Sequence, residues 1–159
     1  VRNYREAYGL FACSGILFNH ESPHRPKLFV TQKIVSAASR IYNGSNERLE
    51  LGSLAIARDW GWAPEYVEAM WKMLQLEEPQ DFVIATGRTI TLEEFVQKTF
   101  AYFDLNWEEF VDSNESLLRP SEIMISRGNP AKAKLLLGWS ATKDVDCVIE
   151  GLCRAALGR

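Results

Sequence analysis

The sequence predicts an α/β protein, and three observations lead to that prediction. Short apolar segments of strand length alternate with longer segments whose apolar residues recur at helical spacing. Glycine and proline residues mark the boundaries between these segments. One run, residues 10–18 (LFACSGILF), is almost continuously apolar, which is typical of a strand buried on both faces in a parallel sheet. Alternating strands and helices of this kind indicate an α/β fold.

Boundary residues place the expected elements in the first part of the chain. Glycines that follow periodic segments are typical helix stop signals. The expected elements are the end of a helix at residues 1–8 with its stop at Gly9, a buried strand at 10–18, a polar loop at 19–26, a helix at 29–42 ended by Gly44, a short strand at 48–51 and an irregular loop at 52–62.

The second part of the chain contains more specific signals. Pro64 suits the first position of a helix that runs to about Leu76. Thr91 and Glu94 have the spacing of a capping box, which predicts a helix from there to about residue 103. The remaining expected elements are a strand at 81–85, a short helix that begins after residues 129–130 and ends at Gly138, and an amphipathic helix at 144–157.

Composition narrows the function classes. The 159 residues suit one domain, and 47% apolar and 25% charged residues are ordinary for a globular protein. The net charge of −3 argues against non-specific binding to nucleic acid, which requires a basic face. The sequence shows no apolar run of membrane-spanning length and no signal peptide, so we expect a cytoplasmic protein with no membrane partner.

Cys13, Cys147 and Cys153 are irregularly spaced, which indicates reduced thiols, and we expect no metal site because no cysteine lies near His20 or His24.

The apolar run at residues 10–18 also bears on domain organisation. A strand buried on both faces needs neighbours, and this chain offers few long strands to flank it. Such a strand suits a larger doubly wound sheet. The sequence contains no glycine-rich dinucleotide fingerprint, so we expect that an amino-terminal half is absent from it.

Three groups of polar residues are candidates for binding. The first is Asn19-His20-Glu21-Ser22-Pro23 together with Arg25, directly after the buried strand. Ligands of open α/β folds bind at the carboxyl ends of the strands, where Asn19, Arg25 and backbone amides can meet a nucleotide. The alternative interpretation is a capped surface loop.

The second group is Arg58-Asp59-Trp60-Gly61, in which Arg58 can bind a phosphate in a bidentate manner. The alternative is a surface pair between Arg58 and Asp59, which would contribute little. In the third group, Arg119 can hold a diphosphate and Glu122 can accept two ribose hydroxyls; the alternative is a turn into a helix. Lys33, on the early face of the helix at 29–42, is a further candidate cation, with a solvated lysine as the alternative.

The residues offer no catalytic set of their own. The sequence contains no Ser/His/Asp arrangement, no nucleophile elbow and no P-loop. The residues themselves therefore predict an anion-binding α/β half-domain.

Five separated segments carry a family resemblance that covers nearly the whole chain. They are NYREAYGLFACSGILFNHESPHR (3–25), LGSLAIARDWG (51–61), EPQDFVIATG (78–87), LRPSEI (118–123) and GNPAKAKLLLGW (128–139). In this order the segments resemble GDP-mannose 4,6-dehydratases, which are extended short-chain dehydrogenases. The chain departs from the family pattern at Trp62, Glu65, His24 and Pro26.

The resemblance implies a fold and an activity. It implies the carboxy-terminal part of an NADP-binding Rossmann-type extended short-chain dehydrogenase, with the smaller substrate-binding domain. Residues 1–159 would form a single unit that joins the last part of the Rossmann sheet to the GDP-sugar-binding domain. Members of the family are lyases that convert GDP-mannose to GDP-4-dehydro-6-deoxy-D-mannose and water by internal hydride transfer through bound NADP. This reaction is the first step toward GDP-fucose. Full-length members assemble as dimers or tetramers.

The resemblance also assigns residues. It implies that His20 and Arg25 touch NADP at its nicotinamide end. The positions that match GDP-sugar contacts are Asn19, Lys33, Arg58, Arg119 and Glu122. The catalytic Tyr, Lys, Ser or Thr, and Glu of the family all precede the matching segments, so we expect no catalytic residue in this chain and no activity from the chain alone. Two alternatives stay open: another nucleotide-sugar epimerase or reductase of the same superfamily, and a non-catalytic binding fragment.

Overall fold

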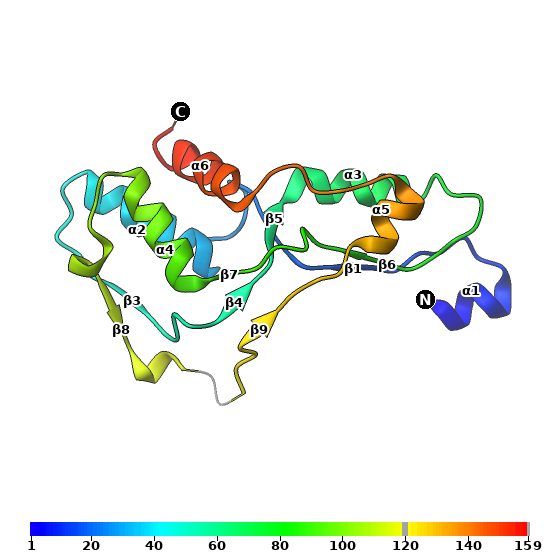
Figure 1. Ribbon diagram of the computed structural model, residues 1–159, viewed down its shortest axis with the longest axis horizontal. Helices are drawn as coiled ribbons and strands as arrows, with labels where there is room; N and C mark the ends of the chain where they lie inside the picture. Colours follow the sequence, from blue (N-terminus) through cyan, green and yellow to red (C-terminus); the bar gives the residue numbers. More distant parts are fainter. Residues whose placement is uncertain (119–120, 159) are drawn as a thin grey trace.

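The computed structural model describes residues 1–118 and 121–158, and it consists of two groups of elements arranged side by side along the long axis (Figure 1). The first group contains α1 (Arg2–Tyr8), β1 (Gly15–Leu17), α3 (Ala63–Met73), β6 (Phe82–Ile84) and α5 (Ala131–Leu137). Strands β1 and β6 pair in parallel, with Gly15 opposite Phe82. We call this group the sheet lobe. Its core consists of Tyr66, Ala69, Met73, Phe82, Ile84, Ala133 and Trp139.

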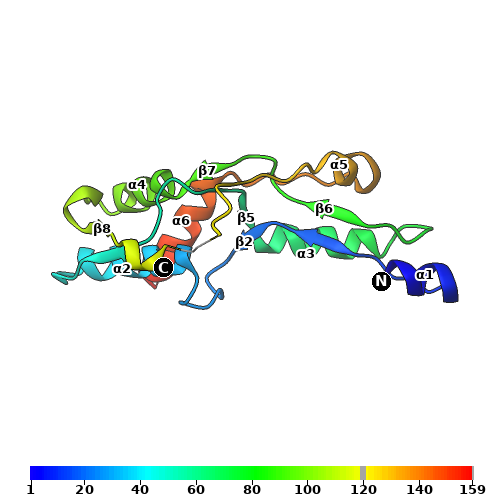
Figure 2. The same ribbon diagram turned by 90° about the horizontal axis from the view of Figure 1, so that it is seen from below.

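The second group, which we call the helical lobe, is built from α2 (Val30–Tyr42), α4 (Leu92–Tyr102) and α6 (Val145–Ala156). These helices pack on one another, and a parallel pair, β3 (Leu49–Leu51) with β8 (Val111–Ser113), lies beside them (Figures 1 and 2). The short 3-10 helices η1 (Trp107–Glu109) and η2 (Glu115–Leu117) flank β8. The core of this lobe includes Ile34, Ala38, Phe95, Phe100, Val148 and Leu152.

Short strands form the junction between the lobes. Strand β2 (Asn19–Glu21) pairs in parallel with β5 (Trp60–Trp62), and β4 (Ala57–Arg58) lies between β7 (Ile90–Thr91) and β9 (Ile125–Ser126). Gly61 faces His20 in this pairing, and a Cβ at Gly61 would lie 2.4 Å from the Tyr66 ring. The junction therefore requires glycine at position 61.

Most helices begin and end close to the predicted residues, but α3 ends at Met73 and not at about Leu76. Gly9 and Gly138 adopt left-handed conformations at the ends of α1 and α5. The capping box at the start of α4 is present, with the Glu94 N–H donating to Thr91 Oγ1 at 3.1 Å. The N-cap Asp144 accepts from the Cys147 N–H at 2.9 Å. The α/β class is confirmed.

Two expectations about strands were wrong. Of residues 10–18 only Gly15–Leu17 form a strand, and the Ile16 side chain is 57% exposed rather than buried. Within the described residues β1 has a single strand neighbour, β6, and its Ile16 remains exposed. The expected loop at 52–62 contains β4 and β5. Both strands are too short to show periodicity, and their partners are distant in sequence.

All three cysteines are free thiols, as predicted, and burial raises the pKa of Cys153 to about 12. None of the helices that the structure describes is long and apolar enough to cross a membrane. Over residues 1–118 and 121–158, no cluster of three or more His, Cys, Asp or Glu side chains is placed to hold a metal ion.

Asp59 joins two of the chain segments that cross between the lobes. It lies between β4 and β5, and its side chain is buried at 1% exposure. Its carboxylate accepts from the Thr86 N–H at 2.9 Å, from Thr86 Oγ1 at 2.8 Å and from the Gly87 N–H at 2.8 Å. Thr86 and Gly87 follow β6 and lead to β7, so these bonds lock the β4–β5 junction to a second crossing segment. A buried carboxylate needs such partners, because it costs several kcal/mol to bury one without them.

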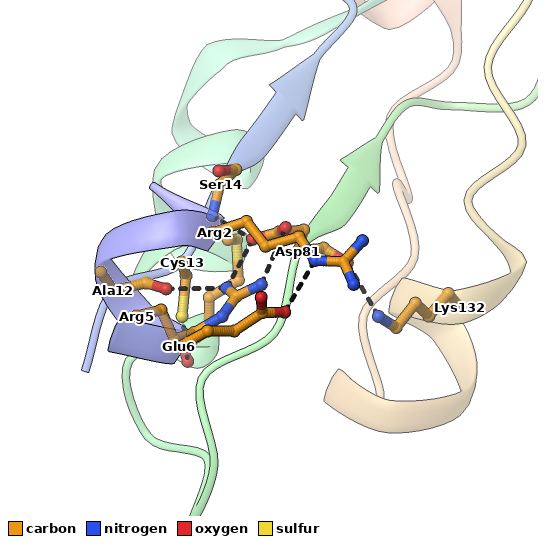
Figure 3. A network of polar contacts seen from close by, with 9 residues as sticks. Arg2, Arg5, Glu6, Ala12, Cys13, Ser14, Asp81 and Lys132 are labelled. Atoms are coloured by element: carbon orange, nitrogen blue, oxygen red, sulfur yellow. Dashed lines mark hydrogen bonds and ion pairs between the residues drawn. The ribbon is translucent and has the colours of Figure 1, made fainter. Parts of the chain in front are cut away.

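A second polar network fixes α1 to the sheet lobe (Figure 3). Arg5 donates from Nη1 and Nη2 to the two oxygens of Asp81 at 2.8 and 3.1 Å, and from Nη1 to the Ala12 carbonyl at 2.8 Å. The Ser14 N–H also donates to Asp81, at 2.8 Å. The bonds to Arg5 and then to Ser14 hold the pKa of Asp81 well below its ordinary value. Asp81 therefore connects α1, the start of β1 and the start of β6.

Replacing Asp59 should destabilise the junction. We expect Asp59→Ala to lower the free energy of unfolding by about 3 kcal/mol, because it leaves two partly buried N–H groups and one hydroxyl without their shared acceptor. Thr86→Val is the matched control, since it keeps both N–H bonds to Asp59 and removes only the hydroxyl, which also accepts from the Arg88 N–H at 3.0 Å, and it should cost about 1 kcal/mol. Urea unfolding followed by circular dichroism measures both. Equal losses in the two variants would contradict the role given to Asp59.

The Asp81 network predicts a pH dependence. Because the folded pKa of Asp81 is depressed, its contribution to stability is present above the unfolded pKa, about 4, and is lost as the pH falls through the lower folded value. We expect Asp81→Asn to be less stable than the wild type at pH 7, with the difference shrinking as the pH falls below about 4. The urea unfolding midpoints of the wild type and the variant, measured at pH 7 and below about pH 4, test this. Asp104→Asn, at an exposed carboxylate, is the control and should show no such trend.

Candidate functional site

A groove of about 580 Å³ lies where β2, the start of α2 and the end of β4 meet. It brings together residues from distant parts of the chain. Five of the seven predicted binding residues line it: Asn19, Arg25, Lys33, Arg58 and Glu122. Arg119 lies outside the residues that the structure describes. His20 is not part of the lining.

Arg58 lies at the centre of the groove wall. As the last residue of β4, it belongs to the middle strand of the β7-β4-β9 sheet. Its Nη2 donates to Glu122 Oε1 at 2.8 Å, and its Nη1 donates to the carbonyls of Ile123 at 2.6 Å and Ala57 at 2.9 Å. The alternative of a surface pair between Arg58 and Asp59 was wrong, because Asp59 is buried and bonded to Thr86 and Gly87.

Lys33 adds a second cation from α2. Its Nζ donates to the Glu50 carbonyl on β3 at 2.6 Å. Lys33 is an exposed residue, and this bond holds its ammonium group at the rim of the groove. Lys33 and Arg58 approach the groove from different elements, and such convergence of cations suits an anionic ligand.

Arg25 is the third cation of the groove, and it is closely held. Its Nη1 donates to the His20 carbonyl at 2.5 Å and lies 3.1 Å from Glu21 Oε1. Its guanidinium carbon lies 4.0 Å from the centre of the Phe29 ring, a cation–π distance. The guanidinium is thus fixed at one rim of the groove.

His20 occupies a different environment from Arg25. Its ring stacks on Tyr66, with centroids 5.0 Å apart, and its Nδ1 lies 2.9 Å from the Phe18 carbonyl. Since a carbonyl only accepts, this contact assigns the proton to Nδ1. Burial raises the pKa of the neighbouring Tyr66 phenol. The structure therefore separates the two residues predicted to touch the cofactor: Arg25 lines the groove and His20 packs behind it.

Two further features of the site were missed from the sequence. Glu21 lines the groove with a side chain that is 1% exposed, and Asp59, the chain neighbour of Arg58, is held by Thr86 and Gly87. Both carboxylates belong to the first two candidate motifs. An acidic residue next to a predicted strand was the only sequence feature that could have indicated their roles. The apolar part of the lining consists of Leu28, Phe29, Val30, Leu51, Ile56, Trp60, Leu92 and Leu117. An apolar pocket with a few convergent polar groups is typical of a small-molecule site.

A smaller cavity, of about 270 Å³, shares Arg58 and Trp60 with the groove. Arg88, Lys98 and Lys143 line it, together with Asp144 and Asp146. Lys98 pairs with Asp146 at 2.7 Å. This cavity contains none of the other predicted binding residues, so we assign the candidate site to the larger groove.

Known proteins resemble the chain both in sequence and in structure. A family model described as GDP-mannose 4,6 dehydratase matches residues 1–152. GDP-mannose 4,6 dehydratase 2 of Arabidopsis thaliana is 54% identical over 137 residues, which cover 86% of this chain and 37% of that protein. The Homo sapiens GDP-mannose 4,6 dehydratase is 42% identical over 172 aligned positions, covering 98% of this chain and 46% of that protein. The chain thus spans less than half the length of these relatives.

Solved structures agree on the fold. RMD from Pseudomonas aeruginosa, complexed with NADPH, superimposes with a TM-score of 0.86 at 16% identity, covering 99% of this chain and 51% of that one. The dTDP-glucose 4,6-dehydratase from Bacillus anthracis, in complex with NAD, gives a TM-score of 0.86 at 14% identity, covering 99% and 48%. At these identities the likeness shows the fold alone, and it confirms the predicted extended short-chain dehydrogenase architecture. Together with the family match over residues 1–152, it establishes that the chain belongs to the GDP-mannose 4,6-dehydratase family.

Proposed function

We propose that this chain forms the nucleotide-sugar-binding part of a GDP-mannose 4,6-dehydratase, a lyase that converts GDP-mannose to GDP-4-dehydro-6-deoxy-D-mannose and water. This reaction is the first step toward GDP-fucose. One observation carries the proposal: in a chain of this family, Asn19, Lys33, Arg58 and Glu122 converge on one groove from four separate segments.

The groove suits a nucleoside diphosphate in chemistry and in position. Arg58 and Lys33 neutralise the diphosphate, and Arg119 is proposed as a further cation for it. Glu122 accepts from Arg58 through Oε1, which leaves Oε2 to accept ribose hydroxyls. Binding energy from the nucleotide then positions the distant sugar for reaction, which is how remote contacts serve catalysis.

We propose NADP as the cofactor. Arg25 fits contact with this anionic dinucleotide, since its guanidinium lines the groove and its buried Nε has no acceptor among the described residues. His20 fits less well, because its ring is stacked on Tyr66 and its Nδ1–H is bonded to Phe18. When bound, NADP would supply the hydride-transfer chemistry of the reaction. The residues of this chain bind and orient; they hold no proton that the reaction needs.

The remaining proposals concern the whole protein. We propose that residues 1–159 form one unit, the last part of the Rossmann sheet joined to the GDP-sugar-binding domain. The catalytic Tyr, Lys, Ser or Thr, and Glu, together with the cofactor-binding half, would belong to the part of the relatives that this chain does not span. We further propose that the full-length protein is a cytoplasmic homodimer or homotetramer.

The chain alone should be inactive. We expect the purified 159-residue chain, given GDP-mannose and NADP, to form no GDP-4-dehydro-6-deoxy-D-mannose, because the proposed catalytic residues lie outside it. Product is measured by liquid chromatography with mass spectrometry, with a full-length relative as the positive control. Product that increases in proportion to the amount of chain would refute the division of roles.

The same chain should nevertheless bind GDP. We expect isothermal titration calorimetry to show binding of GDP in preference to UDP, and Arg58→Ala to weaken GDP binding by about tenfold, since losing a charge-assisted contact costs about 1.4 kcal/mol or more. Arg48→Ala is the matched control, because Arg48 pairs with Asp112 on the β3–β8 pair and does not line the groove. An unchanged Kd in Arg58→Ala would remove Arg58 from the site. A preference for UDP would favour another nucleotide-sugar enzyme of the superfamily.

A further inference from the structure

Glu21 is a buried carboxylate at the end of β2 to which no role has been assigned. Its side chain is 1% exposed, and burial raises its pKa. Each of its oxygens faces a different element. Oε2 accepts from Thr31 Oγ1 at 2.7 Å, and Oε1 lies 3.1 Å from Arg25 Nη1. Glu21, Arg25 and Thr31 all line the groove, so the carboxylate links two parts of its wall.

The contact between Glu21 and Arg25 is an ion pair and not an aligned hydrogen bond. The Oε1 to Nη1 distance is that of an ion pair, yet Oε1 has no aligned hydrogen bond within the described part of the chain. The directional contacts of Arg25 are elsewhere, with the His20 carbonyl and the Phe29 ring. Because the Arg25 side chain is only 19% exposed, its charge needs a nearby anion to remain at the groove. Glu21 supplies that anion.

The bond to Thr31 acts on the second part of the wall. Thr31 lies in the first turn of α2, two residues before Lys33. Next to it, Gln32 Nε2 donates to the Ser22 carbonyl at 2.9 Å. These two bonds tie the start of α2 to the end of β2, and so they fix where Lys33 enters the groove.

We propose that Glu21 is a positioning residue of the site: it holds Arg25 at the cofactor side of the groove and, through the start of α2, fixes where Lys33 meets the nucleotide. This inference rests on the proposed function for its ligand, a nucleoside diphosphate. Glu21 acts through Arg25 and Thr31 and does not touch the ligand itself.

The first test needs no ligand. Phenylglyoxal modifies accessible arginines, and mass spectrometry reports the rate at each one. Glu21→Gln keeps the shape of the side chain and removes its charge. We expect the rate of Arg25 modification to rise about fivefold or more, because a side chain that is no longer held opens more often to solvent. The modification rate of the exposed Arg48 should stay unchanged. An unchanged Arg25 rate would overturn the proposal. If Glu21→Gln fails to fold, Thr31→Val frees the carboxylate without removing its charge; the Arg25 rate should then rise about twofold, and no rise would overturn the proposal.

The second test separates positioning from general destabilisation. GDP affinity is measured for Thr31→Val, which breaks the bond from α2 to Glu21, for Lys33→Gln and for the double variant, with melting temperatures as the folding control. We expect Thr31→Val alone to weaken GDP binding about fivefold, but to change it less than about twofold in the Lys33→Gln background, because residues that act through one another are not additive. Equal weakening in both backgrounds would show a merely structural role and contradict the proposal. Absence of GDP binding by the wild-type chain would count against the proposed function, and the arginine reactivity would still decide whether Glu21 holds Arg25.

Discussion

The buried carboxylate of Asp59 is the contact on which the rest of the arrangement depends. It receives three hydrogen bonds from Thr86 and Gly87, and thereby joins two of the segments that cross between the lobes. Its chain neighbours, Arg58 and Trp60, both line the groove. The bonds of Asp59 therefore hold the segment that carries these two groove residues. The lobes have separate hydrophobic cores, so packing alone would leave their relative position less constrained.

The cations of the groove are also held in place by hydrogen bonds within the protein. Arg58 is bonded to Glu122 and to two backbone carbonyls, Lys33 to the Glu50 carbonyl, and Arg25 to the His20 carbonyl. Each cation is thus ordered before any ligand arrives, which lowers the entropy lost on binding. The two carboxylates of the wall, Glu21 and Glu122, compensate two of the three positive charges. One positive charge remains in excess among these groups, which suits an anion that must also be released.

Local chemistry made the helices predictable from the sequence. The capping box of Thr91 and Glu94, the N-cap Asp144 and the left-handed Gly9 and Gly138 are all properties of neighbouring residues. The strands of the junction were not predictable, because β4 and β5 have two and three residues and are defined by partners far away in sequence. The residues of the site also differed in how far they could be predicted. Motif residues such as Arg58 and Glu122 were candidates from their charge, and the family resemblance predicted that they bind the substrate. The roles of Asp59 and Glu21 depend on contacts with Thr86 and Thr31, which only the fold brings close.

The most direct test of the central claim is a crystal structure of the chain with GDP bound. The account predicts that the diphosphate lies within hydrogen-bonding distance of Arg58 and Lys33, with the ribose facing Glu122. A nucleotide bound elsewhere, for example in the smaller cavity beside Arg88 and Lys143, would contradict the assignment of the groove.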